Sequence, residues 1–388
     1  MERDLASIRN RSLMIGVVLL GLCGLGALAG PDQFFRSYLL GWVFWGGLAI
    51  GCMPLIMLHH LTGGAWGLVI RRVLEAGVGT LPLVAVLFVP VIVGLGRIYV
   101  WARPEVVAAD PLLQHKAAYL NAPFFVGRTV LYFAIWIAMA QLLIRWSSEQ
   151  DRTGDVALAR RMQLFSGPGI GVVGLTGTFA AVDWVMSLDP HWFSTIFGML
   201  FLAGQNLSAF ALSILLLFGL SDRKPLAGVV QPSIYQDLGK LLLAFVMLWA
   251  YLSFSQFLII YSGNLVEEIP YFLERGRGGW QWVGGALIVL HFAVPFVLLL
   301  SRDLKRNGAV LAGVAGFVLL MRFVDTMWMI MPSLSASYFV VHWMDLAAPL
   351  GIGGVWLWML LGRLEARPLL PVHDPYAEET FADAAEQH

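Results

Sequence analysis

Charged side chains interrupt several of the long apolar runs in this sequence. Arg322 and Asp325 stand three residues apart within one run, so on a helix they share a face and can pair. Asp183 lies near the end of another run. An ionisable group inside an apolar helix is costly, which makes it a candidate functional residue. Desolvation and charged partners bring the pKa values of carboxylates and imidazoles towards neutrality, so the chemistry they suit is proton transfer.

The other candidates extend this set into a broken line of proton carriers. The expected outer half of the line comprises Asp183, Arg322, Asp325, Asp189, His191, His342 and Asp345. His291 is expected at the centre, among the polar side chains of Gln205, Asn206, Ser253, Ser255 and Gln256. The expected inner, cytoplasmic side comprises His59, His60 and Glu75.

Each of these residues also has a purely structural interpretation. Asp189 precedes Pro190, which fits a helix N-cap with proline at the first helical position. Arg322 and Asp325 would neutralise each other without further purpose. The two adjacent histidines lie where an apolar run meets water. The gathering of ionisable groups on one side of several spans favours a functional interpretation over packing alone.

The composition indicates that lipid surrounds the elements that position these groups. Hydrophobic types make up 59% of the 388 residues and charged types only 13%, about half the charged share of a globular protein. A membrane helix needs about 20 apolar residues, and ten stretches qualify: 13–30, 39–60, 74–96, 127–145, 169–187, 192–219, 240–262, 280–300, 308–331 and 343–362. Because the runs are continuous, a membrane β-barrel is disfavoured. We expect an all-α integral membrane protein, with one membrane domain over 1–365 and a short cytoplasmic tail over 366–388.

The distribution of Lys and Arg predicts the orientation. With a cytoplasmic N-terminus and ten crossings, 17 of the 25 basic residues fall on the inner side, seven on the outer side and Arg322 inside a span. Both termini are therefore expected in the cytoplasm. The alternative is a cleavable signal peptide ending near Ala29, which would leave nine spans. Basic and acidic residues cancel at 25 each, so the net charge gives no reason to expect nucleic acid as a partner.

The sequence offers no obvious redox centre of its own. Cys23 and Cys52 are the only cysteines, so iron–sulfur ligation, attached haem and a disulfide framework are excluded. Only His59 and His60 share an expected helix, and adjacent residues point about 100° apart; a single haem held between two helices stays open. The segment 169–174 fits GxGxxG but opens a membrane helix with no strand before it, so helix packing or a bend explains it better than nucleotide binding.

Five longer segments carry a family resemblance: HHLTGGAWG (59–67), YLNAPFFVGR (119–128), DWVMSLDPHWFSTIFG (183–198), SFSQFLIIYSGNLVEEIPYF (253–272) and RFVDTMWMIMPS (322–333). In this order they resemble ActF, an NrfD/PsrC-like membrane subunit of bacterial alternative complex III, the quinol:cytochrome c oxidoreductase. The resemblance covers about residues 9 to 365. Val266 departs from the pattern, where proline is expected.

The resemblance implies a fold, partners and a role. It implies eight helices in two four-helix bundles plus two peripheral helices, with no redox cofactor on this chain and a proton route through it. Haem c and iron–sulfur clusters would sit on partner subunits beside an ActC-like membrane subunit in the inner membrane, with a terminal oxidase as a further associate. Menaquinol or ubiquinol would be the substrate of the complex. Quinone contacts on this chain are expected at Asp189, His191 and Tyr338.

Two other classes of protein compete with this interpretation. A secondary transporter would fit ten spans rich in glycine, although such proteins usually show inverted repeats, and we find no clear repeated motif. A purely structural scaffold subunit would need its buried ion pairs only for packing.

Overall fold

The computed structural model describes residues 2–334, 338–371, 373–375 and 377, and it is helical throughout its regular parts, with no strand among the described residues. Ten segments of this described part are long and apolar enough to cross a membrane. They run over Leu5–Ala29, Pro31–Thr62, Ala65–Val93, Ala122–Thr153, Val156–Leu188, Phe197–Leu220, Pro232–Gly263, Trp280–Leu300, Gly308–Leu334 and Met344–Glu365. The expected all-α, ten-span membrane fold is thereby confirmed.

Eight of the spans contain one long helix each. These helices are α1 (Glu2–Ala29), α2 (Pro31–Thr62), α9 (Ala122–Thr153), α10 (Val156–Trp184), α11 (Phe197–Leu220), α12 (Pro232–Gly263) and α17 (Gly308–Leu334). The last of them is α18 (Met344–Glu365). Several of these helices start with proline in the first turn, where its missing N–H costs nothing.

The third and eighth spans are divided. The third consists of α3 (Ala65–Gly79), α4 (Leu81–Val86) and α5 (Val89–Val93), followed by α6 (Leu95–Ile98). Pro82 and Pro90 stand at the starts of α4 and α5, and each removes a backbone donor, which explains the breaks. The eighth consists of α14 (Trp280–Ala286), the π-helical segment η3 (Leu287–Ala293) and α15 (Val294–Leu300).

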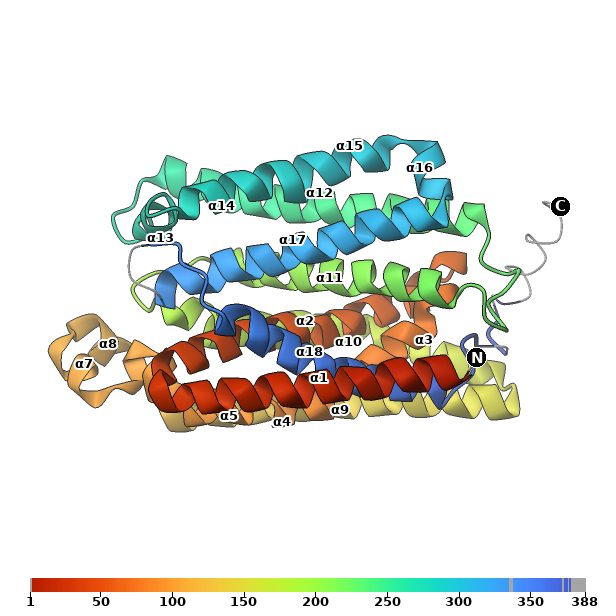
Figure 1. The fold of residues 1–388 in the computed structure, drawn as a ribbon, viewed down its shortest axis with the longest axis horizontal. Helices are drawn as coiled ribbons and strands as arrows, with labels where there is room; N and C mark the ends of the chain where they lie inside the picture. Colours follow the sequence, from red (N-terminus) through yellow and green to blue (C-terminus); the bar gives the residue numbers. More distant parts are fainter. Residues whose placement is uncertain (1, 335–337, 372, 376, 378–388) are drawn as a thin grey trace.

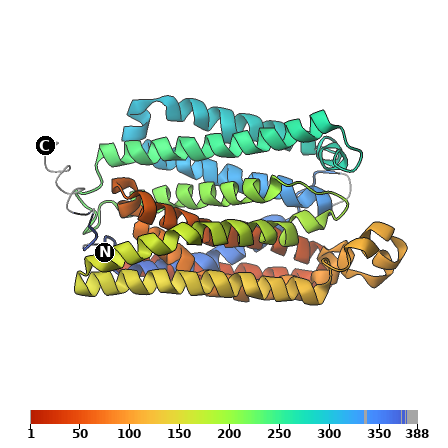
Figure 2. The same cartoon turned by 180° about the vertical axis from the view of Figure 1, so that it is seen from behind.

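The spans form two groups of four with two helices outside (Figure 1). One group contains α2, the third span, α9 and α10, and the other contains α11, α12, the eighth span and α17. Helices α1 and α18 pack on each other and, through α18, against α2. From behind, the nearest helices are α9 and α10 in the first group and α12 in the second group (Figure 2). This arrangement matches the two four-helix bundles and two peripheral helices that the family resemblance implies.

Helices α2 and α11 form the seam between the two groups. A Cβ added to Gly51 would lie 2.3 Å from the backbone oxygen of Gln205, and one added to Gly47 would lie 2.0 Å from the Gln205 side-chain oxygen. Glycine at both positions therefore lets the two backbones approach closely, as small residues do in membrane helix pairs. Among the glycines of the segment 169–174, only Gly169 has such neighbours, so the packing interpretation holds for that position alone.

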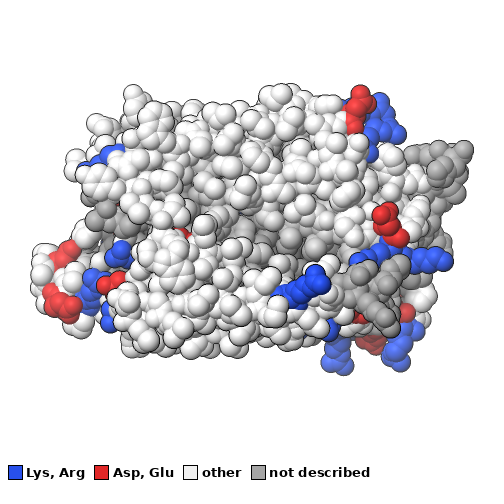
Figure 3. All heavy atoms as spheres, viewed as in Figure 1, with Lys and Arg blue, Asp and Glu red and all other residues white. Residues whose placement is uncertain are grey.

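The bundle has two polar ends and an apolar middle. Helix α1 begins and α18 ends at one end, which we call the terminal end, and Arg9 forms an ion pair there with Glu365 (Figure 1). Short helices α7 (Pro104–Ala109) and α8 (Pro111–Lys116) project from the opposite end, the far end. On the face seen in Figure 3, charged side chains gather at these ends and leave the middle almost bare, as expected for a body surrounded by lipid.

The sixth span begins later than expected, and the N-cap interpretation of Asp189 is wrong. Residues 189–196 are turns and irregular chain, and α11 starts at Phe197. Asp189 follows the short 3-10 helix η2 (Met186–Leu188) and caps no helix. The loop is held by tertiary contacts instead, since the Lys116 ammonium donates to the carbonyl oxygen of Pro190 at 2.6 Å and the Trp192 ring stacks on that of Tyr271.

Candidate functional site

Buried ionisable groups occur at three levels along the bundle. We call them the central cluster, the terminal-end network and the far-end cluster. The central cluster consists of Trp249, His291, Arg322 and Asp325, together with Ser208. These residues come from α11, α12, η3 and α17, the four spans of one group.

Arg322 and Asp325 form the ion pair that their spacing predicted. Both side chains are buried, and the pair lies within one turn of α17. Asp325 also accepts a hydrogen bond of 3.1 Å from the indole nitrogen of Trp249, and Arg322 donates to the hydroxyl of Ser208 at 3.3 Å. Gly204 makes room for the guanidinium, because a Cβ there would lie 2.2 Å from Arg322 Nη2. A charged pair is thus held inside the bundle by partners from two other helices.

His291 is the second component of the central cluster. It lies in the π-helical segment η3, and its side chain is fully buried. Neither ring nitrogen has a hydrogen-bond partner within the described chain. Buried polar atoms in native proteins are almost always paired with protein or ordered water, and π-helical turns are frequent at functional sites. Both ring nitrogens of His291 are therefore left without a protein partner inside the described part of the bundle.

The polar side chains expected at the centre lie on α11 and α12, two of the helices that contribute to the central cluster. Gln205 is buried in the seam against Gly47, while the amide nitrogen of Gln256 and the amide oxygen of Asn206 are buried without a partner. Amides can orient ordered water but do not titrate, so these residues suit a connecting role.

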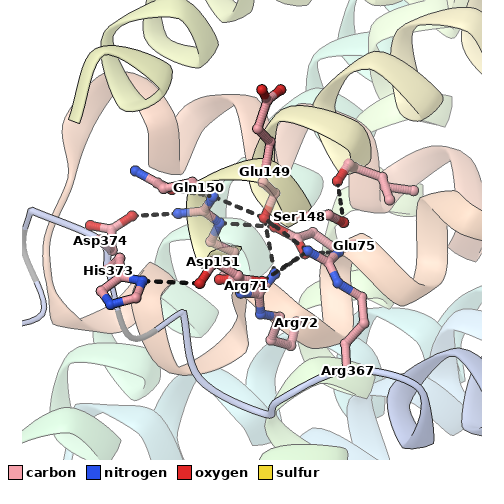
Figure 4. A network of polar contacts seen from close by, with 12 residues as sticks. Arg71, Arg72, Glu75, Ser148, Glu149, Gln150, Asp151, Arg367, His373 and Asp374 are labelled. Carbon is pink, nitrogen blue, oxygen red and sulfur yellow. Dashed lines mark hydrogen bonds and ion pairs between the residues drawn. The ribbon is translucent and has the colours of Figure 1, made fainter. Parts of the chain in front are cut away.

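The terminal-end network is the largest group of buried charges (Figure 4). The Arg71 guanidinium on α3 donates to Glu75 at 2.9 Å and forms an ion pair with Asp374. Arg72 binds the other oxygen of Glu75 at 2.6 Å and pairs with Asp151 of α9. These charges balance locally, which is the condition for burying them.

Two residues of α9 and one beyond α18 complete the network. Ser147 donates to Glu75 at 2.6 Å and accepts from Arg72 at 2.9 Å. Arg367 donates to Glu75 at 2.7 Å and to Asp151 at 3.1 Å. Glu75 therefore binds three guanidinium groups, and it is the only one of these acids that the sequence singled out.

His59 and His60 lie beside this network at the end of α2. They line a pocket of about 180 Å³ together with Arg71 and Asp374. His60 Nδ1 lies 3.1 Å from the Ser166 hydroxyl, while its Nε2 is buried without a partner. His59 is almost fully buried, which removes the expectation of simple interfacial hydration for that residue.

The far-end cluster is built around Asp183. The Arg128 guanidinium binds it with two hydrogen bonds of 2.9 and 2.8 Å, and Tyr132 donates to it at 2.9 Å. Arg128 also lies 3.7 Å above the ring of Tyr119. Burial, and then the negative charge of Asp183, raise the pKa of Tyr119 to about 12. The Asp183 carboxylate thus accepts three hydrogen bonds from side chains of α9.

Asp189 lies in a second far-end group with Tyr271 and Arg275. Burial raises the pKa of Asp189, against the opposing charge of Arg275. Burial also raises the pKa of Tyr271, and the negative charges of Asp325 and Asp189 add to the effect. The pKa of Tyr271 is thus affected by one acid of the central cluster and by one acid of the far end. Glu274 has a raised pKa as well, because of burial and then the charge of Asp189.

The remaining predicted residues lie apart from these groups. Asp345 accepts hydrogen bonds from Ser37 at 2.5 Å, from Gln33 at 2.9 Å and from the backbone N–H of His342 at 2.8 Å, so it ties the start of α18 to α2. His191 is exposed and lies 2.7 Å from the Asp110 carboxylate. Tyr338 is also exposed. The expected outer half of the path is therefore not one continuous group of side chains.

Several residues of these clusters were missed by sequence reasoning. Arg71, Arg128 and Arg367 counted only as positive charges that set the orientation. Asp374 was assigned only to the short cytoplasmic tail, and the structure buries its side chain. The spacing of Arg71 and Arg72 before Glu75 was a local signal for pairing. No local signal marks the pairing of Arg128 with Asp183, 55 residues apart, or of Arg71 with Asp374, 303 apart.

Comparison with known proteins does not identify the chain. No family model matches it. A search of curated proteins also finds no match.

Proposed function

We propose that this chain is a multi-pass subunit of a bacterial quinol-oxidising complex, and that it moves protons between the two ends of its helices. The partner subunits would carry the electrons on haem c and iron–sulfur clusters, next to an ActC-like membrane subunit. This assignment of partners, and of menaquinol or ubiquinol as the substrate of the complex, rests on the sequence resemblance. The proton role rests on the geometry.

The observation that carries the proposal is the central cluster. A membrane helix that needed only packing would have no reason to bury Arg322, Asp325 and an imidazole without a partner. Asp325 and His291 both contact the same indole, that of Trp249, so the two titratable groups lie on either side of one side chain. Carboxylate and imidazole in such proximity can pass a proton through one or two ordered waters.

The other two levels extend this cluster towards both ends. At the terminal end, His59 and His60 lie on α2 about two turns from Gly51, which packs against Gln205 of the seam. At the far end, Tyr271 stacks on Trp192 of the loop that contains Asp189, and Arg275 donates to the Met329 carbonyl oxygen of α17, the helix of Asp325. The proposed order is therefore the histidine pair, the seam amides, the central cluster, Tyr271 and Asp189, with water filling the intervals.

The direction of transfer follows from the proposed orientation. We place the terminal end in the cytoplasm because of the excess of Lys and Arg there. Moving one charge across 100 mV requires about 2.3 kcal/mol. Quinol oxidation on the partner subunits would have to supply that energy, so proton movement and quinol turnover should rise and fall together.

A paired substitution in the assembled complex tests the proposal. Arg322→Gln with Asp325→Asn keeps the local charge neutral, so a loss of function reflects lost titration and not an uncompensated buried charge. We expect fewer protons released per quinol oxidised. Asp237→Asn is the control, because Asp237 is half exposed in an ion pair with Lys240. Unchanged proton release with normal assembly would reduce the central pair to a structural role.

Quinone contacts on this chain are a second, subordinate proposal centred on Asp189. The positive charge of Arg275 acts on Asp189, and Arg275, Tyr271 and Trp192 stack in one buried column beside it. His191 and Tyr338, the other two expected contacts, are exposed side chains at the same end. Photolabelling of the complex with an azidoquinone should mark this region, and label confined to a partner subunit would contradict the proposal.

A further inference from the structure

The chain beyond α18 turns back across the terminal end of the bundle. We call residues 366–371 and 373–375 the C-terminal strap. Arg367 binds Glu75 and Asp151, and His373 Nδ1 lies 3.0 Å from the backbone oxygen of Asp151. Leu370 is buried, which adds an apolar anchor. The strap is thus docked on α3 and α9 of its own bundle (Figure 4).

The strap brings one carboxylate into the pocket beside the histidine pair. Asp374 lines that pocket with His59, His60 and Arg71, and its side chain is 7% exposed. Met162 and Gln163 of α10 form another wall. Arg160, also on the wall, is exposed, so the pocket opens to water. A pocket of about 180 Å³ that has two imidazoles and a carboxylate on its wall has room for several water molecules.

Protonation of Asp374 would not leave Arg71 without a carboxylate partner. Arg71 forms an ion pair with Asp374, and on another nitrogen it donates to Glu75 at 2.9 Å. When Asp374 takes up a proton, Arg71 keeps its hydrogen bond to Glu75, but the network then holds one excess positive charge, which favours release of the proton to a neighbouring group. The other titratable or charged groups that line this pocket are Arg160 of α10 and the two imidazoles of α2.

We propose that Asp374 is the proton-collecting group of this chain and that the pocket beneath it is where protons enter. Its carboxylate takes a proton from bulk water or buffer, then gives it through pocket water to a ring nitrogen of His59 or His60 and regains its negative charge. This inference rests on the proposed function. It adds that the collector comes from the chain beyond the last span and not from any membrane helix.

Chemical rescue in the intact complex tests this role. Asp374→Asn should slow proton uptake at the terminal end by about 100-fold, the lower limit of what a positioned proton-transfer group contributes. Added formate or azide should restore uptake, since small weak acids can enter the pocket and carry protons in place of the carboxyl group. Asp374→Glu should retain uptake, and Asp237→Asn, exposed at the same end, should behave as wild type.

The rescue separates this proposal from a purely structural strap. Arg367→Gln removes contacts of the strap but leaves the Asp374 carboxylate in the chain. If Asp374→Asn only loosens the strap, it should resemble Arg367→Gln, and weak acids should rescue neither variant. That result, or full uptake by Asp374→Asn, would overturn the inference and leave the proposed function standing. Wild-type complex that takes up no protons at this end during quinol oxidation would overturn the proposed function itself.

A second variant covers the case in which Asp374→Asn fails to assemble. Cys23 and Cys52 are buried, so Asp374→Cys would be the one accessible thiol among the described residues. Alkylation by iodoacetate restores a carboxylate at this position, whereas iodoacetamide adds a neutral group of similar size. Uptake should return only after iodoacetate. Equal recovery with both reagents would overturn the proposal.

Discussion

The indole of Trp249 meets the imidazole of His291 edge to face, with ring centroids 4.1 Å apart and the ring planes at 79°. The same indole donates its N–H to Asp325. Trp249 therefore stands between the two titratable groups of the central cluster. In the proposed path, a proton that passes between Asp325 and His291 would pass close to Trp249, through ordered water.

Replacing Trp249 separates its two contacts. Trp249→Phe keeps an aromatic ring against His291 but removes the hydrogen bond to Asp325. We expect a loss of about 1.5–3 kcal/mol in the free energy of unfolding, the usual value for a hydrogen bond to a charged group. Thermal unfolding of the purified protein measures it. Trp282→Phe is the control, because Trp282 is 78% exposed and should change stability by about 0.5 kcal/mol or less.

The ion pair of Arg128 and Asp183 should be strongly coupled. Asp183 is fully buried and receives both hydrogen bonds of the guanidinium. Asp183→Asn leaves a largely buried cation unpaired, which should destabilise the fold by about 3–5 kcal/mol. Arg128→Gln with Asp183→Asn removes both charges and should cost clearly less than the sum of the two single variants. A double-mutant cycle of unfolding free energies checks this, and additive costs would show that the pair is not coupled.

The sequence predicts the apolar framework better than the polar sites within it. Ten spans follow from hydropathy alone, since each run must match the thickness of the bilayer. The pairing of Arg322 with Asp325 also follows from sequence, because both residues lie within one helical turn. Asp189 shows the limit of local rules. Its position before Pro190 fits a cap, but the loop is held by Lys116 and Tyr271, which are distant in sequence.

Long-range partners explain the rest of what sequence reasoning missed. Glu75 was singled out as an isolated inner acid, yet it binds arginines from α3 and from the C-terminal strap. Asp345 was expected in the proton path, and its hydrogen bonds to Ser37 and Gln33 of α2 give it a structural role as well. In both cases the spacing along one helix is visible in the sequence, whereas the neighbouring helix that supplies the partner is not.

The seam between α2 and α11 should not tolerate a methyl group at Gly51. A Cβ there would lie 2.3 Å from the backbone oxygen of Gln205 and 3.0 Å from the backbone nitrogen of Asn206, and backbone atoms cannot move aside cheaply. Gly51→Ala should therefore destabilise the protein by at least about 1–3 kcal/mol. Gly174→Ala is the matched control in α10, since a Cβ there meets nothing within 4 Å. Alanine at that position should be neutral or stabilise by up to about 1 kcal/mol. Equal melting temperatures for the two variants would contradict the close approach.

Two acids at the far end should give stability opposite dependences on pH. Burial raises the pKa of Asp189 above its ordinary value of 3.8. The folded state then holds this proton more tightly than the unfolded state does, so stability falls as pH rises from about 3.8 through the raised value. Asp110 differs, because the hydrogen bonds from His191 and from the backbone of residues 112–113 outweigh its desolvation and lower its pKa. Its contribution is present above 3.8 and is lost as pH falls through the lowered value.

Neutral variants of these two acids isolate each effect. Asp189→Asn cannot ionise, so its melting temperature should fall less than that of the wild type between pH 4 and pH 7. Asp110→Asn should instead lose less stability than the wild type as pH falls below 4. Near neutral pH its melting temperature should change with pH as that of the wild type does. Melting temperatures measured across this range for the wild type and both variants compare the two slopes directly. A steeper fall for Asp189→Asn than for the wild type would show that Asp189 is stabilised in its charged form, and Arg275 would then be the partner that decides its protonation.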